Sequence, residues 1–144
     1  MWIIFALAAS AFWGLSYVFH EQVYRHLSIY TTIAIHASVL AVTFLALALG
    51  KGLLREDVAT ILSSQKVITL LIASVSVFML AELFIALSIV SKNATLAGLI
   101  EISYPIFIAL FAYLIFRESE LNTGVAIGGA IIMLGVLVVF WFGK

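Results

Sequence analysis

Three ionisable side chains interrupt otherwise apolar stretches of the sequence: His36, Glu82 and Glu101. An ionisable group inside a bilayer costs about 2.5–3.5 kcal/mol on insertion scales, so such residues are candidates for function. Glu82 lies ten residues before Lys92 and Glu101 nine residues after it. In a helical hairpin about that turn the two carboxyl groups would reach similar depths, and if they met, one would keep its proton. The pair is therefore a candidate proton-sensitive site.

Structural and catalytic interpretations of the same side chains stay open at this point. A glutamate in a membrane helix often hydrogen-bonds a neighbouring hydroxyl or carbonyl group, and one hydroxyl can satisfy a lone histidine. The sequence has no cysteine and no His-x-x-x-His pair, so we expect no metal and no cofactor. It also lacks His-Glu-x-x-His and Gly-x-Ser-x-Gly, which argues against an enzyme, although the glutamates with His36 could do acid–base work.

Pro105 lies four residues after Glu101 in the middle of an apolar stretch. Proline has no N–H group, so it kinks a helix and frees a carbonyl group near Glu101. Broken membrane helices of this kind line transport sites. The alternative is that the kink serves packing only.

Composition predicts a membrane protein built only of helices. Of the 144 residues 65% are hydrophobic and 10% are charged, whereas soluble domains carry about a quarter charged residues. The net charge is zero and no basic tract indicates nucleic acid. Continuous apolar runs of about 20 residues predict transmembrane helices rather than a barrel. We expect one domain, residues 1–144, in the inner (plasma) membrane, with five spans near 2–20, 28–50, 67–90, 94–116 and 122–142.

Polar residues mark the ends of these spans. Ser28 and Asn122 stand where N-caps would start the second and fifth spans. Short turns at 91–93 and 117–120 predict that the last three spans run antiparallel to their neighbours. In the loop at 51–65, four apolar residues recur at helical spacing: Leu54, Val58, Ile61 and Leu62. A short interfacial helix and a plain solvated connection both fit that pattern.

The first and second spans each carry a polar stripe, and the last carries glycines. The stripes consist of Ser10, Gly14, Tyr17 and Glu21, and of Ser28, Thr32, His36 and Thr43. Such stripes face a cavity or another helix, and tight packing is the alternative. Gly124-x-x-x-Gly128 allows close helix approach, which predicts either a dimer face or internal packing.

Basic residues are divided almost evenly between the two sides of the membrane. One side receives Lys51, Arg55, Lys66 and Arg117, and the other receives Arg25, Lys92 and Lys144. Because excess Lys and Arg normally mark the cytoplasmic side, four against three predicts insertion in both orientations. Two oppositely oriented copies would form an inverted homodimer of ten helices with a cavity near the midplane, as inverted repeats do in many transporters.

Several motifs together resemble one repeat of the EamA-type domains in the drug/metabolite transporter superfamily. They are Phe12-Trp13-Gly14, Ser91-Lys92-Asn93-Ala94-Thr95-Leu96-Ala97, Tyr104-Pro105-Ile106-Phe107, Leu114-Ile115-Phe116-Arg117-Glu118 and the glycines from Gly128 to Gly135. Their order covers nearly the whole chain, whereas most relatives fuse two such repeats. His36 stands where many members carry arginine, so a substrate role of that arginine does not transfer.

The resemblance implies a secondary carrier for a small organic solute, working as a dual-topology homodimer. Within its motifs Trp13 and Tyr104 join Tyr17 as candidate substrate or proton site residues. The alternatives are a subunit of a heteromeric carrier and a membrane assembly protein that transports nothing. The expected partners are a second, inverted copy of the chain, the lipid bilayer and a small-molecule substrate.

Overall fold

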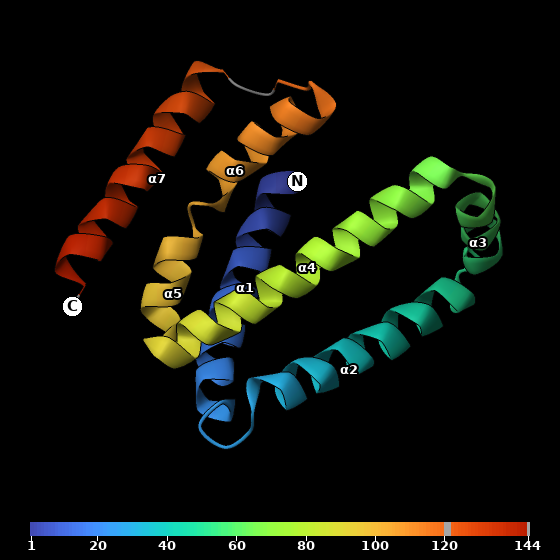
Figure 1. The fold of residues 1–144 in the computed structure, drawn as a ribbon, viewed down its shortest axis with the longest axis horizontal. Coiled ribbons are helices and arrows are strands. Elements are labelled where there is room, and N and C mark those ends of the chain that lie inside the picture. Colours follow the sequence, from blue (N-terminus) through green and yellow to red (C-terminus); the bar gives the residue numbers. More distant parts are fainter. Residues whose placement is uncertain (120–121, 144) are drawn as a thin grey trace. The chain divides into compact units, whose positions relative to one another are not determined.

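The computed structural model describes residues 1–119 and 122–143, and its regular secondary structure there is entirely helical (Figure 1). Along the chain the helices are α1 (Trp2–Val23), α2 (Ile29–Gly50), α3 (Leu54–Ser63), α4 (Gln65–Ser91), α5 (Ala94–Glu101), α6 (Tyr104–Phe111), the π-helix η1 (Ala112–Phe116) and α7 (Thr123–Phe142). Within the described residues, five segments are long and apolar enough to cross a membrane.

The five observed spans confirm the prediction and move its boundaries by a few residues. They are Trp2–Val23, Ile29–Gly50, Gln65–Ser91, Ala94–Phe116 and Thr123–Phe142. The largest changes are that the first span runs three residues further and the third begins two residues earlier. Each has at least the roughly 20 residues that a bilayer core requires. The chain is thus a multi-pass membrane protein.

The chain divides into two compact units, each of which is described separately. The first consists of Met1–Glu21 and Ser88–Lys144, and the second of Gln22–Leu87. The first unit therefore contains nearly all of α1 together with α5, α6, η1 and α7, and the second contains α2, α3 and most of α4. Lys144 and Glu120, which were used in the charge and turn predictions, lie outside the described residues.

Side-chain caps at Ser28, Asn93 and Asn122 begin the second, fourth and fifth spans, as polar residues at these places predict. Ser28 and Asn122 accept hydrogen bonds from the backbone N–H groups three residues further on, Thr31 and Val125. Asn93 caps α5 in the same way, accepting from the N–H of Leu96 at 2.8 Å. Each cap satisfies one of the N–H groups that a helix start leaves unpaired.

The fourth span is interrupted where Pro105 was predicted to break it. α5 ends at Glu101, and α6 begins at Tyr104 with the proline in its first turn. Because proline has no N–H group, the Glu101 carbonyl cannot accept its usual bond from four residues ahead. Ile106 instead donates to the Ser103 carbonyl at 3.1 Å. The span ends at Arg117, which adopts the left-handed conformation with φ of 60°.

A turn at Gly52 joins α2 to α3, the helix that the 51–65 segment contains. Gly52 has φ of 70°, and the N–H groups of Gly52 and Leu53 donate to the carbonyls of Leu49 and Ala48. Two such bonds around a left-handed glycine are the Schellman motif, a common helix C-terminus. The loop therefore contains a helix, α3, rather than only a solvated connection.

The left-handed conformation of the turn predicts that substitution of Gly52 destabilises the protein. Gly52→Ala should lower the free energy of unfolding by about 1–2 kcal/mol, because a Cβ atom disfavours the left-handed conformation. Space is not the reason, since nothing lies within 4 Å of the added atom. Gly50→Ala is the matched control: it also has open space and lies inside α2, where alanine is the better helix former. Denaturant unfolding followed by circular dichroism in detergent measures both, and equal effects would contradict the account.

Candidate functional site

Two hydrogen bonds join α1 to α5 within the first unit. The Tyr17 hydroxyl donates to Oε2 of Glu101 at 2.5 Å, and the backbone N–H of Ala94 donates to Oε2 of Glu21 at 2.7 Å. Tyr17 and Glu21 come from the polar stripe predicted on the first span. The C-terminal part of that stripe, Tyr17 and Glu21, thus faces another helix, whereas Ser10 and Gly14 are exposed.

Glu21 acts at the start of α5, a role that the sequence analysis did not assign to it. Its carboxylate accepts from Ala94 while the neighbouring Asn93 side chain accepts from Leu96. The partial positive charge of a helix N-terminus favours an anionic group at this place. The signal in the sequence was present, since Glu21 lies four residues after Tyr17 on the same helical face.

The Tyr17 ring is held on three sides. On α1 it lies 5.8 Å from the Trp13 ring and 6.5 Å from the His20 ring, measured between centroids. On α5 a Cβ atom added to Gly98 would stand 3.5 Å from Cδ2 of Tyr17. Tyr17 and His20 are each only 9% exposed. This packing fixes the hydroxyl against Glu101, and it brings in His20, which the sequence analysis missed.

The Tyr17–Glu101 pair lies at the interruption of the fourth span. Glu101 is the last residue of α5 and is half-buried. After two intervening residues the chain re-enters a helix at the exposed Tyr104. At this end of α5, Glu101 combines its side-chain carboxyl with a backbone carbonyl that Pro105 leaves without its usual helical donor. The arrangement can therefore bind a proton or a positively charged group.

An apolar groove of about 600 Å³ runs between α6 and α7 in the first unit. Its lining includes Pro105 and Ile106 on one side and Gly128 and Gly129 on the other. A Cβ atom added to Gly129 would stand 3.6 Å from the Ile106 side chain, so this glycine faces α6. Gly124 is exposed and outside the groove. Of the two glycines predicted as a packing face, only Gly128 lines the groove, and nothing lies within 4 Å of a Cβ atom added to it.

The second unit holds the other two ionisable candidates. Glu82 on α4 is half-buried, and His36 on α2 is exposed. Burial raises the pKa of the Tyr24 hydroxyl above its ordinary value, and the negative charge of Glu82 raises it further. Tyr24 lies in the connection after α1. A meeting of Glu82 with Glu101 stays a prediction.

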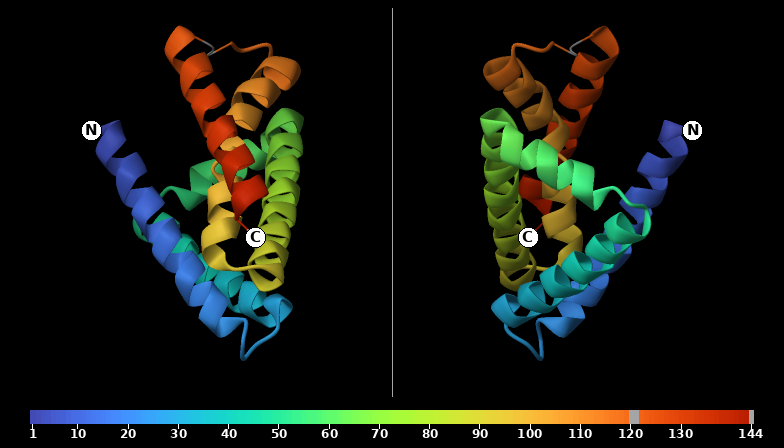
Figure 2. Two further views of the ribbon diagram at one scale, coloured as in Figure 1. Left: turned by 90° about the vertical axis from the view of Figure 1, so that its left-hand side faces the viewer. Right: turned by 90° about the vertical axis from the view of Figure 1, so that its right-hand side faces the viewer.

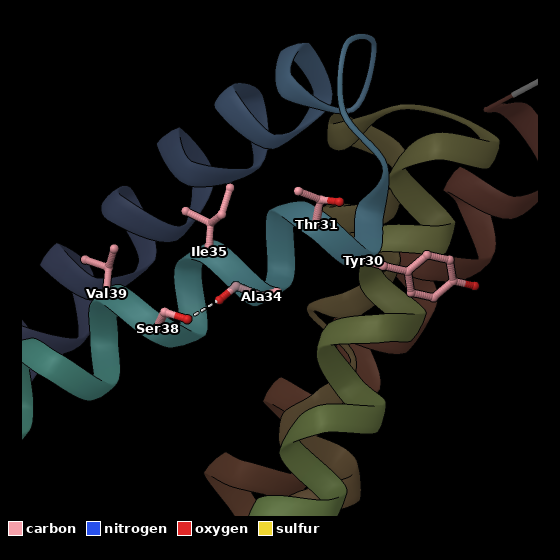
Figure 3. A pocket seen from close by; sticks show the side chains of 6 residues that line it. All are labelled: Tyr30, Thr31, Ala34, Ile35, Ser38 and Val39. Carbon is pink, nitrogen blue, oxygen red and sulfur yellow. Dashed lines mark hydrogen bonds between the residues drawn. The ribbon is translucent and has the colours of Figure 1, made fainter.

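In the polar stripe of α2, Thr32 is hydrogen-bonded to Ser28 of the same stripe. Thr32 is buried and its hydroxyl donates to the Ser28 carbonyl at 3.0 Å. Figure 3 shows a shallow hollow on one face of α2 in which Ser38 likewise donates to the Ala34 carbonyl, at 2.8 Å. All six lining residues come from this one helix, namely Tyr30, Thr31, Ala34, Ile35, Ser38 and Val39. An open hollow on a single helix does not enclose a ligand, and His36 is not part of it.

The close approach of α5 to Tyr17 is tested by enlarging Gly98. Gly98→Leu should destabilise the fold by about 1–3 kcal/mol, because the side chain must displace a well-packed ring. Gly14→Leu is the control, since it lies in α1 with nothing within 4 Å of an added Cβ atom. The melting temperature in detergent reports both variants. If Gly98→Leu melts with the parent protein, Tyr17 does not pack against α5 as described.

Comparison with known proteins is consistent with this architecture. Residues 1–141 match the EamA-like transporter family. Searches of curated proteins and of solved structures each found no match. The match spans all five membrane helices and both partners of the Tyr17–Glu101 contact. The chain therefore belongs to the EamA-like transporter family.

Proposed function

We propose that this chain carries a small organic solute across the membrane as an inverted homodimer, with Glu101 as the group that binds substrate or proton. The observation that carries the proposal is the half-buried Glu101 carboxyl, which accepts a hydrogen bond from Tyr17 beside the helix break. Family membership supports transport in general. The position of the Glu101 carboxyl beside the helix break supports placing the binding site there.

Competition for one carboxyl group links binding to helix packing. Without a ligand, Glu101 accepts from Tyr17 and thereby joins α5 to α1. A proton or a cationic group that binds Glu101 competes for the same oxygen and weakens that joint. Because the helix is interrupted between Glu101 and Tyr104, α5 can move without carrying α6 along as part of one rigid rod. A binding event that releases one helix from another is what alternating access requires.

The inverted dimer rests on charge and on span number. Five spans place the two termini on opposite sides, and the basic residues divide four to three between those sides. With so small a difference, neither orientation is strongly preferred. Two opposed copies would provide the two inverted halves between which transporters of this architecture bind their substrates.

Dual topology is tested by labelling from one side of intact cells. The chain has no cysteine, so Ser63→Cys at the end of α3 and His26→Cys before α2 each provide a single reactive site, on opposite sides. Both should be labelled in part by a membrane-impermeant maleimide, because both orientations coexist. Labelling of the same variants after permeabilisation gives the maximum with which labelling of intact cells is compared. Full labelling of one site and none of the other would show a single orientation.

The carboxyl is tested by glutamine substitution in reconstituted vesicles. Glu101→Gln should slow uptake more than Glu82→Gln does at each pH between about pH 6 and about pH 8, since only Glu101 adjoins the break. Glu56→Gln on the exposed face of α3 is the matched control. The nearest titratable neighbours on α1, Tyr17 and His20, remain unchanged in every variant.

The assay needs a transported solute, which a thermal-shift screen of amino acids, nucleosides, organic cations and sugars would supply. A ligand of this site should raise the melting temperature of the parent protein more than that of Glu101→Gln, because binding to the folded state stabilises it. Normal transport by both glutamine variants across the pH range would assign the carboxyls to packing alone.

A further inference from the structure

We propose that α3 is an interfacial helix that lies on the bilayer surface with the side chains of Leu54, Val58, Ile61 and Leu62 inserted among the lipids. The partner is the headgroup and acyl-chain boundary of the membrane itself. The proposal concerns the second unit only and does not depend on what the protein transports.

The chain holds α3 at the membrane boundary. α2 ends at Gly50 and α4 begins at Gln65, and both are membrane spans. Only residues 51–53 and residue 64 connect α3 to them. The Schellman turn at Gly52 fixes the first connection. At the second, the Ser64 side chain accepts from the N–H of Val67 in the first turn of α4. Neither connection is long enough to carry α3 away from the bilayer.

The direction of α3 fits a helix that lies in the plane of the membrane. Figure 2 shows α3 running across the end of α4 rather than continuing along it. At 1.5 Å per residue its ten residues are roughly 15 Å long, too short to cross the hydrocarbon. A short helix held crosswise at the end of a span lies along the surface.

One face of α3 is apolar, and the described chain covers only part of it. At 100° per residue the four apolar side chains fall within a single arc of about 100°. Val58 and Leu62 are exposed, Leu62 at 76%, whereas Leu54 and Ile61 are half-buried. Exposed apolar side chains on a helix tethered to a membrane gain free energy by facing lipid rather than water.

The charged residues of the segment are placed as such a helix requires. Glu56 projects opposite the apolar arc, towards water, whereas Arg55 lies at the edge of that arc. The long arginine side chain can follow the apolar surface and put its guanidinium among the lipid phosphates. Lys51 and Lys66 flank the helix and add positive charge at the same level.

The experiment uses the full chain in vesicles of phosphatidylethanolamine and phosphatidylglycerol. Single cysteines replace Val58, Ile61 and Leu62 on the apolar face, and Glu56 and Thr60 on the polar face as matched controls. Each carries a nitroxide, whose collisions with oxygen and with a water-soluble nickel chelate are compared by electron paramagnetic resonance. The chelate is loaded on both sides, so the orientation of the protein does not affect the result.

The ratio of oxygen to nickel collisions should be several-fold higher at the three apolar sites than at Glu56 and Thr60. High nickel access at all five sites would show a solvated helix and overturn the proposal. Protection from both reagents at the apolar sites would show that protein covers this face, and would overturn it as well. Should a substitution at Val58 prevent folding, Leu54 provides another site on the same face.

Discussion

Hydrocarbon offers no hydrogen bonds, so a polar group at membrane depth must find its partner within the protein. This constraint explains why α1 lies against α5. The Glu101 carboxyl and the Tyr17 hydroxyl satisfy each other, and Glu21 satisfies a backbone N–H group at the start of the same helix. Apolar side chains distinguish weakly between lipid and a neighbouring helix, whereas these polar contacts have few alternatives. They therefore select one helix as the neighbour of α1.

The same contacts place the carboxyl where the fold can respond to a ligand. Pro105 removes a backbone hydrogen bond one turn beyond Glu101, and the helix restarts at Tyr104. α5 is consequently a short piece held at its start by Glu21 and at its end by Tyr17. Its neighbour α6 shares an apolar groove with α7. The interruption thus separates α5, whose Ala94 and Ala97 are buried and whose last residue carries the carboxyl, from α6, which has no buried residue.

Local features were predictable from the sequence, and side-by-side contacts were not. The spans, the caps at Ser28 and Asn122 and the break at Pro105 follow from residues close together in the chain, whose physical effects are local. Counting residues predicts similar depths for Glu82 and Glu101 but does not say which side chain contacts Glu101. The structure gives Glu101 a hydrogen bond from Tyr17, and a meeting with Glu82 stays a prediction. Several helices cross the membrane at the depth of any one residue, so only the packed fold determines which of them contacts it.

A double-mutant cycle tests the central claim, that one hydrogen bond between Tyr17 and Glu101 joins α1 to α5. Unfolding free energies in detergent would be compared for the parent, Tyr17→Phe, Glu101→Leu and the double variant, because leucine, unlike glutamine, cannot accept the hydrogen bond. The account predicts a favourable coupling energy of about 0.6–1.7 kcal/mol, the range found for hydrogen bonds between membrane helices. Strictly additive effects of the two substitutions would contradict it, because each side chain would then act without the other.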